Sequence, residues 1–223
     1  MFRLMQRRNL RKSLKRMRMR HFAFGVAILT AAIILPISFL KQGTIATYNT
    51  IRPLFLDDGG KMCVTELHRR GVKFTPLGDT GSANCPIKNA VKINTFKDAL
   101  PSSAFVLSCT TALNLDDWLA ENRIKKFAHM GTINCRKMRG KGLQSEHSYG
   151  TAIDISTVDG ASVQEDWAKD SLDGIKLRKV AASACEHFSN VLTPDTNTLH
   201  KNHFHFDNGF GNRCGAKSQF KLR

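Results

Sequence analysis

The sequence lacks several features that mark common classes of protein. None of its six cysteines form a C-x-x-C pair, which argues against a zinc ribbon or a zinc finger. It contains no internal repeat and no stretch of low complexity, so most of the 223 residues are expected to be globular. A chain of this length can bury one domain with short additions, and it is short for two full domains.

Acidic residues are absent from the first twenty positions, which hold nine lysines and arginines. This segment therefore supplies +9 of the formal net charge of +16, and the rest of the chain supplies only +7. Basic surfaces suit any polyanion, and a bacterial cell wall is one as much as DNA is. Because the charge is concentrated at one end, we predict no nucleic-acid partner.

Charged residues are also absent from residues 22–40, FAFGVAILTAAIILPISFL. As a helix, this run would be about 28 Å long, roughly the hydrocarbon thickness of a bilayer. We predict a basic cytoplasmic tail over 1–21, a single transmembrane signal anchor in the inner membrane over 22–40, and a periplasmic location for the rest. The alternative is a signal peptide cleaved near Thr44-Ile45-Ala46, although the run is longer than a usual signal core.

The cysteines support export, because an even number at wide spacing in an oxidising compartment indicates structural disulfides. All six follow the apolar run: Cys63, Cys85, Cys109, Cys135, Cys185 and Cys214. Pairing of sequential neighbours would close loops of about 22 to 30 residues, each stabilising the fold by about 3–4 kcal/mol. Many other connectivities are possible, and the sequence selects none of them.

Beyond a stalk over 41–58, residues 59–223 are predicted to form a single α+β domain, with a small, largely antiparallel sheet flanked by helices and preceded by the one transmembrane helix. Hydrophobic periodicity predicts helices at 61–70, 111–126 and 177–192. Strands are expected at 72–74, 91–96, 104–109, 128–135, 153–158, 161–164 and 203–207. Asp159-Gly160 is typical of a two-residue hairpin turn, whereas residues 75–90 have the composition of a loop.

Two histidine-rich motifs stand out, and the later one is HKNHFHFD at 200–207. Because side chains alternate between the faces of a strand, His203, His205 and Asp207 share one face. Phe204 and Phe206 share the other face, where they can seal a core. Two imidazoles two residues apart can then reach a single site.

The earlier motif is SEHSYGTAIDIS at 145–156. His147 and Asp154 would be too far apart on a helix, but a turn at Ser148-Tyr149-Gly150 followed by a strand lets both face one point. Three nitrogen or oxygen ligands and one open position are typical of catalytic zinc. We therefore predict one zinc ion held by His147, Asp154 and one of the pair His203 and His205, since imidazole with a carboxylate favours zinc.

Other polar residues are predicted to support catalysis at this site. The histidine of the pair that does not bind the metal is expected to act as general base or to stabilise the transition state. Arg136 is the candidate for holding a substrate carbonyl or carboxylate. His200 is either a support for the ligands or a plain loop residue. For each histidine the alternative is a hydrogen-bonded structural role, which is the stronger interpretation for a histidine standing alone.

These motifs resemble those of known families. SEHSYGTAIDI is similar to the S-x-H-x-x-G-x-A-x-D signature of D-Ala-D-Ala carboxypeptidases and dipeptidases, which belong to a wider group of zinc peptidases with lysostaphin-type and hedgehog-type folds. Residues from about 63 to 214 more closely resemble the bacterial extensin-like C-terminal domain family. That resemblance is carried by CVTELHRRGVKFTPL, FVLSC, TINCR, SEHSYGTAIDI, ACEHFSNVLTPD and HKNHFHFD.

The resemblance implies that His147, Asp154 and His205 are the zinc ligands and that His203 is the catalytic histidine. It implies a membrane-anchored periplasmic zinc peptidase acting on peptide stems or cross-links of peptidoglycan. The dipeptidases carry a glutamate base three residues before the last ligand, whereas this chain has Asn202 there. The alternative function is therefore a catalytically inactive, metal-containing module that binds or scaffolds the cell wall, as hedgehog-type domains show to be possible.

Overall fold

The structure is a computed structural model that describes residues 43–57 and 59–216. The chain divides into two compact units, Met1–Tyr48 and Asn49–Arg223. In the first unit residues 43–48 are helical, and the Thr47 hydroxyl donates a hydrogen bond to the Gly43 carbonyl at 2.8 Å. The second unit contains every element described below.

Serine side chains cap the first turns of α3, α4 and α5 in the second unit. The Ser108 hydroxyl accepts a hydrogen bond from the Thr111 N–H at 3.4 Å, and the Ser171 hydroxyl accepts one from the Gly174 N–H at 3.2 Å. Each satisfies a donor that the first helical turn leaves unpaired. The α-helices are α2 (Gly60–Arg69), α3 (Cys109–Glu121), α4 (Val163–Asp166) and α5 (Leu172–Ser183), and the 3-10 helices are η1 (Arg52–Phe55), η2 (Glu146–Tyr149), η3 (Ala184–Glu186) and η4 (Thr198–His200).

The strands form two sheets. The first is antiparallel, in the order β1-β2-β4, and consists of β1 (Lys73–Ser82), β2 (Cys85–Thr95) and β4 (Phe105–Ser108). The second has the order β10-β8-β9-β6-β5-β3, with β7 paired to β6, and is mixed because β3 with β5 and β10 with β8 are parallel pairs. Its strands are β3 (Leu100–Pro101), β5 (Lys126–Gly131), β6 (Ala152–Val158), β7 (Ala161–Ser162), β8 (Asn190–Leu192), β9 (Phe204–Asp207) and β10 (Arg213–Cys214).

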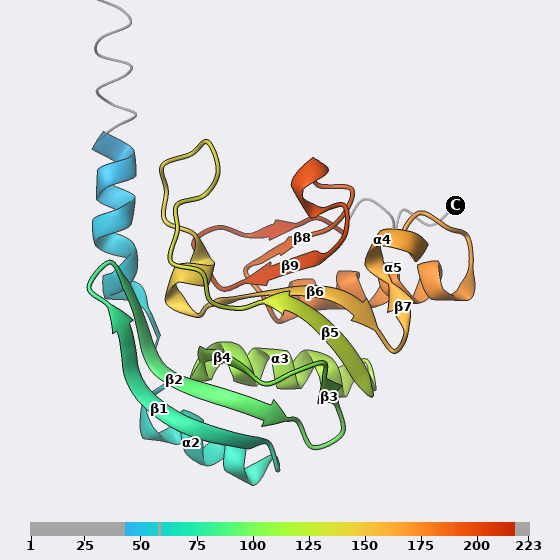
Figure 1. Cartoon of the computed structure of the whole chain (residues 1–223), viewed down its shortest axis with the longest axis horizontal. Helices are drawn as coiled ribbons and strands as arrows, with labels where there is room; N and C mark the ends of the chain where they lie inside the picture. The colour runs from blue at the N-terminus through green and yellow to red at the C-terminus, as the bar shows by residue number, and fades with distance from the viewer. Residues whose placement is uncertain (1–42, 58, 217–223) are drawn as a thin grey trace, which may run out of the picture. The chain divides into compact units, whose positions relative to one another are not determined.

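Helix α3 lies between the two sheets, where its buried face joins their cores (Figure 1). Trp118 of α3 is fully buried, and its ring packs edge-on against Phe206 of β9 with 5.2 Å between centroids. The indole N–H donates a hydrogen bond to the Val180 carbonyl of α5 at 2.8 Å, so the polar end of the ring is also satisfied. The phenylalanine face of β9 therefore seals the core, as alternation predicts.

All six cysteines form disulfides, which confirms the prediction from their number and spacing. The pairs are Cys63–Cys109, Cys85–Cys135 and Cys185–Cys214. Only the last pair joins sequential neighbours. The other two have sequence separations of 46 and 50 residues, so they close longer loops than pairing of neighbours would. The first of them ties α2 to α3 and the second ties β2 to the segment that precedes η2.

The described residues form an α+β fold, but the predicted fold class is wrong in two respects. Residues 75–90 do not form a loop but most of the β1–β2 hairpin, so there are two sheets and not a single small one. The prediction also included a transmembrane helix, and across residues 43–57 and 59–216 no helix combines the length and the apolar character needed to cross a bilayer. The predicted anchor over 22–40 and the tail over 1–21 lie outside the described residues.

Element boundaries differ from the predictions where local capping decides them. Helix α5 covers Leu172–Ser183 and not 177–192, because Ser171 caps its start and residues 190–192 form β8. The predicted hairpin turn is confirmed, since Asp159 and Gly160 both have positive φ angles, of 48° and 90°, between β6 and β7.

Candidate metal centre

Three elements converge on one polar cluster. His147 lies on η2, Asp154 on β6 and His205 on β9. Asp154 and His205 are directly opposite each other in the antiparallel register of β6 and β9, which places both side chains on the same face. Between His147 and Asp154 the chain bends at Gly150, whose φ of 64° is left-handed. The bend and the strand pairing together bring the three side chains to one point.

The distances within this cluster suit a single small cation. His147 Nε2 lies 3.2 Å from Asp154 Oδ2 and 3.2 Å from His205 Nδ1. His205 Nδ1 lies 2.9 Å from Asp154 Oδ1. One potential ligand atom from each residue lies within 4.8 Å of the others. Ligands at about 2.0–2.2 Å from a tetrahedral zinc ion are about 3–4 Å apart, so this donor set fits that ion.

Each imidazole has a second partner that fixes its orientation. His147 Nδ1 lies 3.2 Å from the Thr132 carbonyl, and this bond requires a proton on Nδ1. His205 Nε2 lies 2.8 Å from Asp207 Oδ2, which holds the proton on Nε2. Asp207 is itself held by the Asn190 side-chain amide at 2.7 Å. These partners leave His147 Nε2 and His205 Nδ1 facing the cluster, the arrangement that metal-binding histidines commonly show.

The electrostatics of the cluster favour positive charge at its centre. Burial would raise the pKa of Asp154, but its contacts with His147 and His205 outweigh burial and hold the pKa far below its usual range. Burial would lower the pKa of His205, but hydrogen bonds to Asp154 and Asp207 raise it to about 10. Two carboxylates beside one imidazole therefore favour a positive charge at this point, which a bound metal ion would also supply.

Two further histidines lie beside the cluster. His203 Nε2 is 3.6 Å from Asp154 Oδ1, and His203 Nδ1 is 2.8 Å from the Asn202 side-chain oxygen. The His200 ring lies 5.2 Å from the His203 ring and 5.7 Å from the His205 ring between centroids. Burial lowers the pKa of His203, and burial with repulsion from His205 lowers the pKa of His200 to about 4. Burial therefore favours the neutral form of both rings.

Comparison of the sequence with known families gives a match that includes both histidine motifs. The family described as "Extensin-like protein C-terminus" matches residues 61–215. The chain belongs to this family. The match covers the extensin-like domain from α2 to β10, and all residues of the cluster lie within it. No curated protein and no solved structure matches the chain. The relation to zinc peptidases stays a prediction.

Arg136 of the extensin-like domain does not contact the cluster in the described residues. Its side chain is exposed, and its guanidinium Nη1 lies 3.5 Å from the Lys137 carbonyl. Its main chain is more firmly placed, because its N–H donates to the Ser148 hydroxyl at 3.1 Å. A role for Arg136 in holding substrate stays a prediction, and it would require the side chain to turn toward the ligands.

Sequence reasoning left two supports of the ligands without a role. Strand alternation predicts that Asp207 lies on the same face as His205. This shared face is the signal from which the contact between the two side chains could be inferred. Thr132 contributes only its main-chain carbonyl to His147. Because every residue carries such a carbonyl, no side-chain pattern could have identified it.

Proposed function

We propose that the extensin-like domain is a zinc-dependent peptidase that hydrolyses peptide bonds of peptidoglycan. The observation that carries this proposal is the convergence of His147, Asp154 and His205 on one point, with potential ligand atoms within 4.8 Å of one another. The side chains of Asp154 and His205 remain 20% and 12% exposed, so the point is reachable from outside. A bound zinc ion would polarise a scissile carbonyl and lower the pKa of water toward 7.

His203 is the group best placed to move a proton at this site. The Asn202 side-chain oxygen, at 2.8 Å, accepts the Nδ1 proton and leaves Nε2 as the basic nitrogen. That nitrogen lies 3.6 Å from Asp154 Oδ1, at the border of the ligand set. Since burial favours the neutral ring, His203 can accept a proton from an attacking water and return it to the leaving amine.

The surroundings of His203 support a peptide substrate outside the cytoplasm. Asn202, the residue before His203, lines an open pocket of about 550 Å³ together with Lys201, Trp167 and Gln164. A lining of mixed polar and apolar side chains with one ammonium group suits a short peptide that carries a carboxylate. The three disulfides suit an oxidising compartment, where peptidoglycan lies. The choice of peptidoglycan itself depends on the resemblance of the motifs.

Digestion of purified peptidoglycan tests the proposal, with the released muropeptides resolved by liquid chromatography and mass spectrometry. We expect the wild-type protein to give a product that disappears on chelation and in the variants Asp154→Asn and His205→Ala. His187→Ala is the matched control, because the His187 ring contacts Glu121 at 2.5 Å and not the cluster. Absence of any zinc-dependent product from the wild-type protein would retire the proposal.

A second function, binding of the cell wall without catalysis, is favoured by Asn202. This residue occupies the position where the dipeptidases that the motif resembles have a glutamate base, and an amide cannot serve as a base. A binding module would retain zinc and sediment with peptidoglycan without releasing muropeptides. The digestion above separates the two functions directly.

A further inference from the structure

Among the lysines and arginines of the described residues, Arg52 of η1 is the most deeply buried. Its side chain is only 3% exposed, and it lies before residue 61, where the family match begins. A buried guanidinium is costly unless it is paired and hydrogen-bonded. Arg52 meets this requirement with Glu146: Nε lies 2.9 Å from Oε1 and Nη2 lies 2.7 Å from Oε2. Two parallel bonds of this kind fix orientation as well as distance.

Glu146 is the residue immediately before His147, so this ion pair holds η2. The Glu146 carboxylate, 8% exposed, also accepts a hydrogen bond from the Thr151 hydroxyl at 2.7 Å, just before β6 begins. The main chain of Gly209 approaches it closely, since a Cβ added there would lie 2.7 Å from the Glu146 side chain. The carboxylate is therefore held from several sides, and η2 with it.

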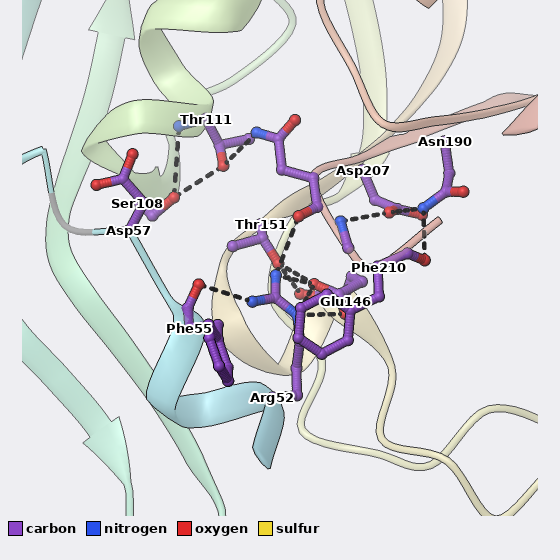
Figure 2. Close-up of polar contacts among 12 residues, drawn as sticks. Arg52, Phe55, Asp57, Ser108, Thr111, Glu146, Thr151, Asn190, Asp207 and Phe210 are labelled. Carbon is purple, nitrogen blue, oxygen red and sulfur yellow. Dashed lines mark hydrogen bonds and ion pairs between the residues drawn. The ribbon is translucent and has the colours of Figure 1, made fainter. Parts of the chain in front are cut away.

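The same guanidinium also holds the end of β9. Arg52 Nη2 donates a hydrogen bond to the Asn208 carbonyl at 3.1 Å. Asn208 follows Asp207, the residue that bonds His205 Nε2 at 2.8 Å. Figure 2 shows Arg52 among Glu146, Thr151 and the Phe55 carbonyl, with Asp207 and Asn190 close by. The Arg52 side chain thus contacts Glu146 of η2, which carries His147, and Asn208, which follows the strand that carries His205.

We propose that Arg52 is a positioning residue of the metal cluster, which fixes η2 and the end of β9 relative to each other so that His147 and His205 face one point. The part that concerns metal rests on the proposed function. Buried ion pairs contribute little net stability compared with apolar residues of the same shape, so stability alone does not account for this pair. A need to hold the two ligand-bearing elements, η2 and β9, in a fixed relative position accounts for the pair.

The test uses the full chain with the double variant Arg52→Met/Glu146→Gln, which removes both charges and leaves no buried carboxylate without its partner. Arg70→Met is the matched control, because Arg70 pairs with Glu66 and Asp116 on α2 and α3 and touches no element of the cluster. Two quantities are measured: the NOE between ring C–H protons of His147 and His205 without metal, and zinc affinity by chelator competition. The two ring centroids are 5.0 Å apart.

We expect the double variant to lose the ring NOE and to bind zinc about 10- to 100-fold more weakly, with Arg70→Met unchanged in both. Arg52→Lys provides a second test should the double variant not fold. Its single ammonium cannot make the parallel bonds to Glu146, so we expect partial loss of both signals. A folded variant that keeps the NOE and the wild-type zinc affinity overturns the inference. Failure of the wild-type protein to bind zinc overturns the proposed function alone, because the NOE still decides the role of Arg52.

Discussion

The two sheets of the extensin-like domain contain strands of very different burial, and β9 and β1 are the clearest examples. In the seven-stranded sheet, β9 presents Phe204 and Phe206 to the core, both fully buried, and His205 to the candidate metal centre. In the three-stranded sheet, β1 is exposed along nearly its whole length. A strand packed on one face can hold the other face rigid, whereas an exposed edge strand has little to hold. Changes in β9 should therefore affect stability or the site, and changes in β1 should affect neither.

The largest effect is expected for Phe206→Ala on the core face of β9. The Phe206 ring packs against Trp118 and Phe188, each at 5.2 Å between centroids, so truncation leaves a cavity among rigid aromatic neighbours. We expect the free energy of unfolding to fall by about 3–5 kcal/mol. Urea denaturation with zinc chelated measures this loss without a contribution from metal binding. A loss below about 1 kcal/mol would contradict the assignment of β9 as the strand that supports the core.

The next effect is expected for Asp207→Asn on the opposite face of β9. The amide keeps the shape of the side chain but weakens the 2.8 Å bond that orients His205. We expect zinc affinity to fall about 10- to 100-fold, equivalent to about 1.4–2.7 kcal/mol. Competition with a chelator measures the change. Asp170→Asn is the control, because the Asp170 carboxylate is fully exposed and pairs with Arg178, which is not part of the cluster. Equal affinity for the wild-type protein and Asp207→Asn would remove Asp207 from the site.

A smaller effect, of about 1.4 kcal/mol per pH unit, is expected from protons that compete with the metal. Without metal, His205 has a pKa raised to about 10 by Asp154 and Asp207, so at pH 7 it carries a proton on Nδ1 that zinc must displace. The lowered pKa of Asp154 means that its carboxylate has no proton to release. Zinc affinity should therefore rise about tenfold per pH unit between pH 6 and 8. Calorimetry in buffers of different ionisation enthalpy measures the proton released, and its absence would contradict this charge state.

The same contrast between sheets explains which elements the sequence could predict. The alternation in HFHFD and the turn Asp159-Gly160 are strong local patterns, and both β9 and the β6–β7 hairpin follow them. Pro76, Gly78 and Gly81 instead give the β1 region the composition of a loop. An edge strand tolerates proline and glycine because one side of its backbone is not paired, and the register of β1 shifts at Pro76/Gly78. Composition therefore gave the wrong answer for the β1–β2 hairpin.

The candidate site shows a similar division between local pattern and tertiary contact. His147, Asp154, His203 and His205 are identifiable because their spacing suits a turn and two strands. Arg52 is not identifiable, because its contact with Glu146 joins residues 94 positions apart and depends on the whole fold. The disulfides divide in the same way: the number of cysteines predicts that they pair, and only the folded chain selects Cys63 with Cys109.

The smallest effect is expected for Leu77→Ala on β1. The Leu77 side chain is 45% exposed, so its truncation removes little buried surface and leaves no enclosed cavity. We expect the free energy of unfolding to change by less than about 0.5 kcal/mol and zinc affinity to stay constant. Leu107→Ala on β4 is the matched substitution in the same sheet, and because Leu107 is fully buried it should cost about 2–5 kcal/mol. Similar losses in the two variants would mean that β1 packs against another surface, and the contrast between β1 and β9 would then be wrong.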